Sequence, residues 1–348
     1  MRAKIINTET IKINVPESLN RLLTNDMNNF EVFKRDGETI NFNGFMSSMI
    51  AGYYEKYQEE VSEQARRTNE LLAKYIKDKK QLEQATSEIV VEEFAAETHE
   101  KKEINSKALK FRSTTETDGI ILEIEEKRKS ANESISGFFR MMLFSYSRNP
   151  VYERERIIYY RNTDIIEEAC RCGKVITFTI RDNPSFLHKV IPYGIKHGPD
   201  ELFNYLLCQE YNQDLEKMVA MTYRLCRIVN PRISASNETI TKEIKGYLEK
   251  MENLAPQYAI MDDQKTCIEF TPAGKKSFQR LYQGRPIVAD KDDPDSNGNV
   301  KFYFECSQDQ LFLYLRRFNP GEARILYPEE LRERLIRFHQ DHLSCLNE

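Results

Sequence analysis

Five side chains suited to binding nucleic acid stand within 40 residues of one another in the middle of the chain. They are His188, Tyr193, Tyr205, Arg224 and Arg227. An arginine guanidinium keeps its charge and offers a planar set of donors to phosphates or base edges. A tyrosine ring offers a face on which an unpaired base stacks, worth about 1–3 kcal/mol per base. These residue types predict binding of a nucleic acid or another anionic ligand. The alternative is a small domain whose tyrosines form the core and whose arginines are solvated.

The elements that carry these residues are short strands. Residues 173–228 contain runs of β-branched and aromatic residues, separated by Gly, Pro, Asn and Asp. The first two runs are residues 175–180 and 190–195. Four or five strands at roughly 10-residue spacing leave no room for helical crossovers. The pattern therefore predicts a small antiparallel barrel.

Three phrases in this segment resemble the WYL domain, an Sm-like or SH3-like barrel of bacterial regulators and CRISPR-associated proteins. The phrases are Pro192-Tyr193, Asn204-Tyr205-Leu206, and Tyr223-Arg224 with Arg227-Ile228. Asn204 stands where the family has tryptophan, Ile180 where it has tyrosine, and His188 where arginine is common. The resemblance implies that the matched aromatic and arginine side chains line a groove for a nucleic acid or an anionic ligand.

An internal repeat occupies the first part of the chain. Residues 10–15 alternate as a strand, with Ile11, Ile13 and Val15 on one face, and two helical patterns follow, the second capped by Asn43. The same order recurs at residues 107–150, where Ser134 caps the second helix. The two second helices align residue by residue, for example Gly44-Phe45 with Gly137-Phe138. Self-similarity of this kind predicts two related supersecondary units.

A strand followed by two helices resembles the ribbon-helix-helix fold, in which two copies pair their strands. The resemblance implies that outward residues of the ribbon enter the major groove of DNA, as in other β-ribbon readers. By position these residues are Lys12 and Asn14 in the first copy, and Lys110 and Arg112 in the second. The first strand carries little charge, so its alternative role is dimerisation only.

The sequence pattern of the last third of the chain predicts a strand, a helix, two strands, a helix and a strand, in that order. The expected strands are 267–270, 287–289, 300–306 and 323–326, preceded by a helix at 237–253 capped by Asn237. This order is the split β-α-β of ferredoxin-like domains. The segment also resembles the extension that often follows WYL domains. Residues 293–298 copy the start of a calcium loop, but Phe304 stands where the final glutamate belongs, so an acidic hairpin turn is the better reading.

The composition and charge of the chain limit the classes of protein to which it can belong. The 348 residues carry a net charge of −4, which counts against a protein that coats nucleic acid over its whole surface. We expect no membrane span, no signal peptide and free thiols in a reducing cytoplasm. No phosphate loop, zinc-protease motif or nucleophile elbow is present in the sequence, so we expect no enzyme, no cofactor and no metal.

These observations predict an α+β multidomain chain. The expected parts are a first ribbon-helix-helix copy (1–60), a helical connector (61–106), a second copy (107–150), a WYL-like barrel with its leading helix (151–233) and a ferredoxin-like extension (234–348).

The whole arrangement is similar to the WYL accessory proteins of type VI-D CRISPR systems. The resemblance implies a cytoplasmic homodimer that binds single-stranded RNA and raises the activity of an RNA-guided, RNA-cleaving effector. A repressor that reads duplex DNA is the alternative, and a structural partner protein with vestigial sites is a third.

Overall fold

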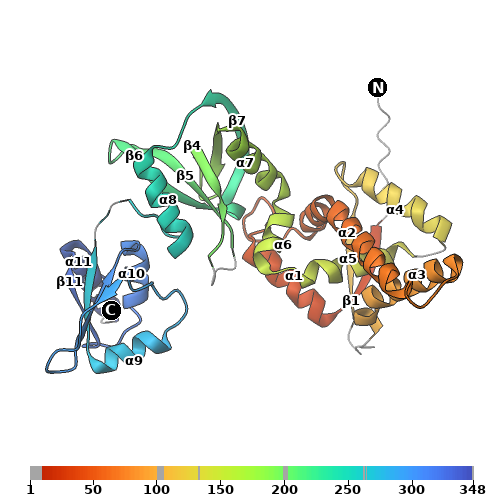
Figure 1. Ribbon diagram of the computed structural model, residues 1–348. Coiled ribbons are helices and arrows are strands. Elements are labelled where there is room, and N and C mark those ends of the chain that lie inside the picture. The colour runs from red at the N-terminus through yellow and green to blue at the C-terminus, as the bar shows by residue number, and fades with distance from the viewer. Residues whose placement is uncertain are drawn as a thin grey trace. The chain divides into compact units, whose positions relative to one another are not determined.

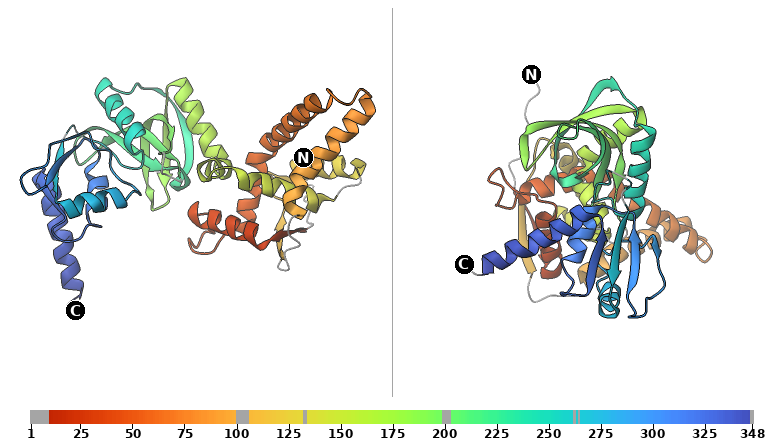
Figure 2. Two further views of the ribbon diagram at one scale, coloured as in Figure 1. Left: turned by 60° about the horizontal axis from the view of Figure 1, so that its bottom comes forward. Right: turned by 90° about the vertical axis from the view of Figure 1, so that its left-hand side faces the viewer.

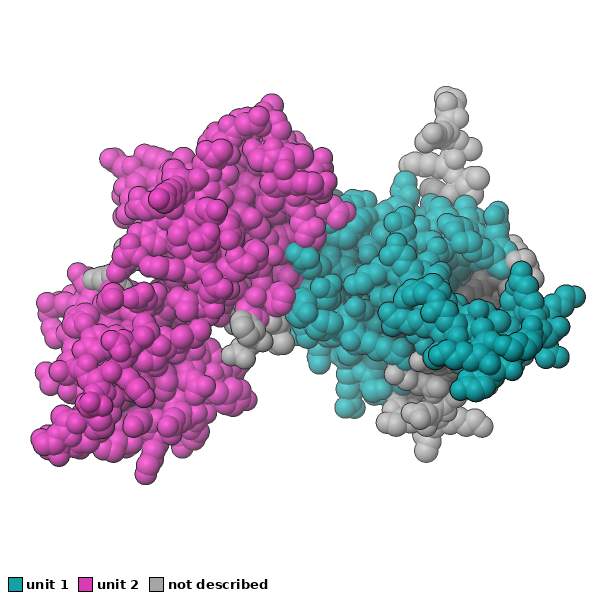
Figure 3. All heavy atoms as spheres, in the orientation of Figure 1, with its two compact units in different colours: residues 1–161 teal, residues 162–348 magenta. Residues whose placement is uncertain are grey.

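The protein combines helices with antiparallel sheets in an α+β arrangement (Figure 1). The computed structural model describes residues 10–99, 106–131, 134–198, 203–261, 263 and 265–346. The chain divides into two compact units, Met1–Arg161 and Asn162–Glu348 (Figure 3).

The first unit is built on a two-stranded ribbon. Strand β1 (Thr10–Pro16) pairs antiparallel with β2 (Ser106–Arg112), so that Lys12 lies opposite Lys110 and Ile13 opposite Leu109. Side chains alternate between the two faces of a strand, and Ile11, Ile13 and Val15 of β1 are buried while Thr10, Lys12 and Asn14 are exposed. The ribbon is therefore complete within one chain.

Two helices follow each strand of the ribbon. Helices α1 (Glu17–Asn29) and α2 (Phe42–Leu72) follow β1, and α4 (Asp118–Ala131) and α5 (Ile135–Arg148) follow β2. The Ser134 hydroxyl caps α5 by accepting from the Gly137 N–H, at the position expected from the sequence. The strand-helix-helix order of the repeat is thus seen in both halves of the unit.

The cap of α2 differs from the prediction. Asn41, not Asn43, accepts the N–H of Gly44 at 3.0 Å. The Asn43 side chain instead accepts the N–H of Arg112 at 2.7 Å. An asparagine at the second position of the helix thereby holds the end of the ribbon, which the sequence alone does not reveal.

Helix α2 is also longer than expected. It continues past residue 57 to Leu72 and turns back into α3 (Lys79–His99), so the two form a helical hairpin (Figure 2). Residues 59–108 were expected to be a helix or helical hairpin, but α2 has no break where the first repeat was expected to end. Residues 100–105 of this connector lie outside the described residues.

A buried ion pair joins three helices of the first unit. Arg154 on α6 (Val151–Ile158) donates to both carboxylate oxygens of Asp26 on α1, at 2.7 and 2.9 Å. The hydroxyl of Tyr146 on α5 donates to the same carboxylate at 3.0 Å. Burial raises the pKa of Asp26, and the bonds from Arg154 and Tyr146 oppose that rise. Helix α6 therefore contributes to the buried core of the first unit.

Helix α7 (Tyr160–Cys172) lies mostly in the second unit and leads into a five-stranded antiparallel sheet. Its strands are β3 (Lys174–Ile180), β4 (Asn183–Lys196), β5 (Tyr205–Asn212), β6 (Lys217–Arg224) and β7 (Ile228–Asn237). The order across the sheet is β6-β5-β4-β3-β7, so β6 and β7 are its two edges.

A three-residue turn forces this sheet to curl. The 3-10 turn η1 (Leu225–Arg227) connects β6 directly to β7. In a flat sheet, strands about 4.8 Å apart would separate the two edges by about 19 Å. Three residues of 3-10 helix rise only about 6 Å. The two edges must therefore approach each other, which bends the sheet toward a barrel.

Helix α8 (Lys242–Leu254) covers the outer face of β5 and β6. Leu207 and Ala220 on the strands pack with Ile244, Leu248 and Met251 on the helix. The predicted cap at Asn237 is wrong, because Asn237 pairs with Lys174 at the end of β7 and Thr241 caps the helix. The β3–β7 pairing continues further along the chain than the sequence pattern indicated.

The last part of the chain forms a four-stranded antiparallel sheet. It contains β8 (Thr266–Phe270), α9 (Pro272–Arg280), β9 (Asp290–Lys291), β10 (Val300–Phe304), α10 (Gln308–Leu315) and β11 (Ala323–Tyr327). The strand order is β11-β8-β10-β9, and α11 (Glu329–Leu346) follows.

The second strand of this sheet lies later than predicted. It spans residues 290–291 rather than 287–289, and these two residues pair with Tyr303 and Phe302. The N–H groups of Ala289 and Asp292, on either side, donate to the carbonyls of Tyr303 and Lys301. The carboxylate of Asp295 accepts the N–H groups of Asn297 and Asn299, which makes residues 293–298 a hairpin turn.

The close approach of α2 and α6 gives a stability prediction. A Cβ at Gly52 would lie 2.4 Å from the carbonyl oxygen of Ile157 and 2.9 Å from Tyr160 Cδ1. Gly52→Ala is expected to lower the free energy of unfolding by about 1–3 kcal/mol, because backbone atoms cannot move aside cheaply. Gly246→Ala in α8, where a Cβ meets nothing within 4 Å, should raise it by about 0.5–1 kcal/mol. Urea unfolding of both variants measures this, and equal effects would contradict the packing described.

Candidate nucleic-acid interface

The ribbon presents a cationic outer face. Lys12, Asn14, Lys110 and Arg112 are all exposed, and the antiparallel register places them on the face opposite the buried residues. Lys12 lies directly across from Lys110, and like charges in that position destabilise a sheet. Among the described residues, no carboxylate forms an ion pair with Lys12, Lys110 or Arg112. An anionic ligand would therefore relieve a repulsion that the described part of the chain leaves in place.

The barrel separates the predicted residues into different surroundings. Tyr205 and Arg224 are direct partners in the β5–β6 ladder and share a face with the pair Leu207 and Thr222. This is the outer face, which α8 covers further along the strands. The guanidinium carbon of Arg224 lies 3.7 Å from the ring centroid of Phe203. The Arg224 side chain is thus held flat against an aromatic ring, beside Tyr205.

Arg227 lies close in sequence to this pair but on the turn η1. Its side chain is 44% exposed and its Nη1 lies 3.0 Å from Asp182 Oδ2, which is 63% exposed. An ion pair this open to solvent contributes little to stability. The arginine therefore remains accessible to a stronger anion.

Tyr193 is tied to α8. Its hydroxyl donates to Glu252 at 2.8 Å, and Lys196 Nζ lies 2.6 Å from the other oxygen of the same carboxylate. Burial and the neighbouring Glu252 carboxylate raise the pKa of Tyr193 to about 12. The hydroxyl is therefore engaged in holding the helix on the sheet, and only part of the ring is open.

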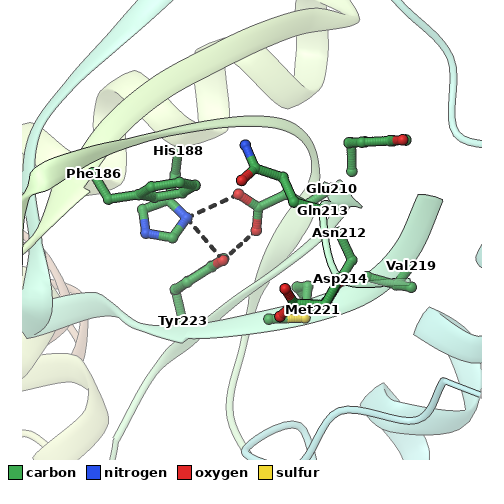
Figure 4. Close-up of a pocket in the computed structure, with 10 residues that line it drawn as sticks. Phe186, His188, Glu210, Asn212, Gln213, Asp214, Val219, Met221 and Tyr223 are labelled. Atoms are coloured by element: carbon green, nitrogen blue, oxygen red, sulfur yellow. Dashed lines mark hydrogen bonds and ion pairs between the residues drawn. The ribbon is translucent and has the colours of Figure 1, made fainter. Parts of the chain in front are cut away.

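His188 lies on the other side of the sheet, with two residues that the sequence analysis did not assign to it. Its Nδ1 is 2.8 Å from Glu210 Oε1 and 3.0 Å from the Tyr223 hydroxyl, and that hydroxyl donates to the second oxygen of Glu210 (Figure 4). The Phe178 ring stacks on the imidazole at 5.3 Å between centroids. His188 and Glu210 are each 8% exposed.

The chemistry of this cluster differs from that of the arginines. Burial, and then the hydrogen bond to Glu210, raise the pKa of Tyr223 far above its ordinary value, so its hydroxyl remains a donor. The adjoining cavity measures about 240 Å³, and Glu210 and Asp214 line it (Figure 4). A cavity with two carboxylates does not favour a phosphate. The structure thus groups His188 with acids and not with Arg224 and Arg227.

Two side chains that contact the candidate residues were not predicted from the sequence. Glu210 is the one charged residue of β5, shortly after the apolar run Leu206-Leu207-Cys208, and that position was the available signal. Phe203 precedes the strand by two residues, and no pattern in the sequence links it to Arg224. Among the described residues, no group of three or more His, Cys, Asp or Glu side chains is arranged to hold a metal ion.

The comparisons with known proteins bear on the fold. No family model matches the chain, and no curated protein matches it. A crystal structure described as that of a CRISPR Cas-related protein is similar over 100% of this chain and 97% of its own, with a TM-score of 0.68 and 17% sequence identity. At this identity the likeness shows a shared fold. The proteasome accessory factor B/C (PafBC) of Arthrobacter aurescens covers 51% of the chain at 16% identity, and its TM-score of 0.21 supports no argument.

None of the helices within the described ranges combines the length and the apolar character that a membrane crossing requires.

Tyr193 and Tyr223 each donate a hydrogen bond to a carboxylate, and the two bonds are expected to differ in their contribution to stability. Tyr223→Phe should lower the free energy of unfolding by about 1–3 kcal/mol, because the buried Glu210 carboxylate loses a donor. Tyr193→Phe should cost about 1 kcal/mol or less, because Glu252 keeps Lys196 as a partner and is nearer solvent. Chemical denaturation of both variants at neutral pH tests the difference. A larger effect at Tyr193 would contradict the arrangement around Glu210.

Proposed function

We propose that this protein is a non-catalytic CRISPR-associated accessory protein that binds single-stranded RNA and raises the activity of an RNA-guided, RNA-cleaving type VI-D effector. The observation that supports a CRISPR role is the fold shared over 100% of the chain with a CRISPR Cas-related protein. The proposal includes a homodimer. The ribbon already pairs within one chain, so a second copy would associate through other surfaces.

The strand orders support the domain assignments in this proposal. Strand-helix-helix halves joined by a ribbon are the arrangement of a ribbon-helix-helix pair. The order β6-β5-β4-β3-β7 with its 3-10 turn fits a WYL-like, Sm-like barrel. The order β11-β8-β10-β9 fits a ferredoxin-like domain.

The RNA surface in the proposal is the end of the barrel around Arg224. Tyr205 offers an aromatic ring there, and Arg224, which lies over the Phe203 ring, and Arg227 offer two guanidinium groups. Unpaired bases stack on such rings and arginines hold backbone or base edges, so binding should be strong and weakly selective for sequence. Tyr193 and His188 are placed at the margin of this surface or away from it.

Arginine removal tests the RNA surface. Replacing both Arg224 and Arg227 with alanine should weaken single-stranded RNA binding by about 3–4 kcal/mol, at about 1.5–2 for each charge-assisted contact. Fluorescence anisotropy with a labelled RNA measures the loss, and thermal melting checks the fold. The matched control replaces Arg66 and Arg67, two exposed arginines of α2 that pair with Glu63. A folded double variant that binds RNA as tightly as the wild type would remove the barrel from the proposal.

A transcriptional repressor that reads duplex DNA is the second candidate. The observation that favours it is the exposed face with Lys12, Lys110 and Arg112, which lacks acidic partners among the described residues. In this alternative the ribbon enters the major groove and the barrel senses a ligand.

Ribbon variants separate the two candidates. Replacing Lys110 and Arg112 with alanine should weaken duplex DNA binding and reduce the slope of log affinity against log salt by about one unit for each lost phosphate contact. Lys12→Ala should have the smaller effect, because β1 carries one cation. Gel-shift titrations with duplex DNA and single-stranded RNA at several salt concentrations provide the comparison. Preference for the duplex would favour the repressor, and identical, negligible effects of all variants would leave the ribbon a purely structural element.

A further inference from the structure

Five large apolar side chains are exposed around the hairpin that joins β5 to β6. Their exposed fractions are 40% for Phe186, 63% for Leu187, 52% for Tyr211, 49% for Leu215 and 39% for Met218. We call these five residues the hairpin patch. Scattered single apolar residues are ordinary on a protein surface, whereas a contiguous group marks an interaction site.

The members of the hairpin patch are contiguous. Tyr211 and Met218 lie directly opposite each other in the β5–β6 ladder. Together with Phe186 and Leu187 on β4, they line one hollow of about 230 Å³. Leu215 lies in the turn of the same hairpin, where its N–H donates to the Asn212 side chain at 2.9 Å. The barrel core is made by other residues of these strands, such as the buried Val190 and Val219, so the patch is not needed to close it.

The charges around the hairpin patch are mostly negative. The hollow shares Phe186, Glu210, Tyr211 and Gln213 with the neighbouring 240 Å³ cavity, where Asp214 is the second carboxylate. Lys189 is the basic residue that lines the hollow, and it is already paired with Glu238 at 2.8 Å. A phosphate backbone would meet repulsion here, whereas a lysine or arginine would find Glu210 and Asp214.

We propose that the hairpin patch is a docking surface for a protein segment that carries an apolar or aromatic side chain next to a lysine or arginine. The apolar side chain occupies the hollow beside Phe186 and Tyr211, and the basic group faces Asp214 and Glu210. A second copy of this chain is a poorer occupant, because an isologous contact would set these carboxylates against themselves.

The docking surface is separate from the proposed RNA surface. Met218 and Arg224 are six residues apart on β6, which corresponds to about 20 Å along a strand. One end of the barrel is cationic and aromatic, and the other is apolar and acidic. The inference rests on the described surface of the barrel and not on RNA binding, so the two proposals fail independently.

The test selects peptides on the full-length protein from a displayed library of random 12-residue sequences. Enriched peptides are expected to combine a large apolar residue with a neighbouring lysine or arginine. A synthetic copy of the most enriched peptide should bind the wild type and bind Leu187→Ser and Tyr211→Ser about tenfold or more weakly. Asp214→Asn should weaken binding of the same peptide and should not weaken binding of a variant peptide whose basic residue is replaced by glutamine.

The control is Leu71→Ser on α2, where the leucine is 60% exposed and thus closely matches Leu187. It should leave peptide binding unchanged, and melting curves confirm that all variants fold. Single-stranded RNA affinity should be the same for the wild type and the patch variants. Enriched peptides without basic residues, or peptides bound equally by the patch variants, would overturn the proposal. It would also be overturned if RNA displaced the peptide, or if the patch variants lost self-association in light scattering, since the occupant would then be RNA or a second copy.

Discussion

The antiparallel pairing of β1 with β2 is the constraint on which the first unit depends. The ladder joins Thr10 to Arg112 and Pro16 to Ser106, so it closes a loop of about a hundred residues. A strand with two helices is too small to bury its own apolar faces. Pairing the strands brings both sets of helices over one shared core, in which Ile13, Val15 and Phe111 are almost completely buried. The same pairing leaves the cationic side chains together on the opposite face.

Buried polar contacts then make this core specific. Removing a partner from a buried ion pair leaves an uncompensated charge, which is far more costly than breaking an exposed pair. Asp26 and Arg154 are such a pair, and Tyr146 adds a third hydrogen bond to it. A second network links Tyr53 of the first half to Ser145 of the second, with Glu60 accepting from both. Each network joins residues from both repeats, so the two halves are specified as partners of each other.

In the second unit, the short turn between β6 and β7 has a comparable role. It brings the two edge strands β6 and β7 toward each other and so curls the sheet. Backbone hydrogen bonds hold the turn in place: Leu225 donates to Asn204 at 2.9 Å, and Arg181 donates to Arg227 at 3.0 Å. The arginines are thereby kept at one end of the barrel, while the β5–β6 hairpin carries the apolar and acidic residues to the other. The proposed RNA surface and the proposed docking surface lie at these two ends.

The sequence by itself determined the local elements of this protein. Alternation predicted β1 and its buried face, the repeat predicted two strand-helix-helix halves, and the runs around Pro192 predicted the antiparallel strands of a small barrel. These predictions succeeded because periodicity and capping depend on near neighbours in the chain. Two predicted helix caps were nevertheless wrong, because Asn41 rather than Asn43 caps α2 and Asn237 belongs to β7.

Only the tertiary structure decided how the candidate site residues are grouped. His188 was predicted to lie beside Arg224 and Arg227, but it contacts Glu210 and Tyr223 instead. Tyr223 and Arg224 are adjacent in sequence and point to opposite faces of β6, because side chains alternate along a strand. Which side chains of neighbouring strands lie opposite each other on a face of the sheet then depends on the register of strand pairing. The bulges in the β3–β4 and β4–β5 pairings shift that register. A sequence pattern contains no record of such shifts, so the division of the barrel into a cationic end and an acidic end is a property of the folded sheet.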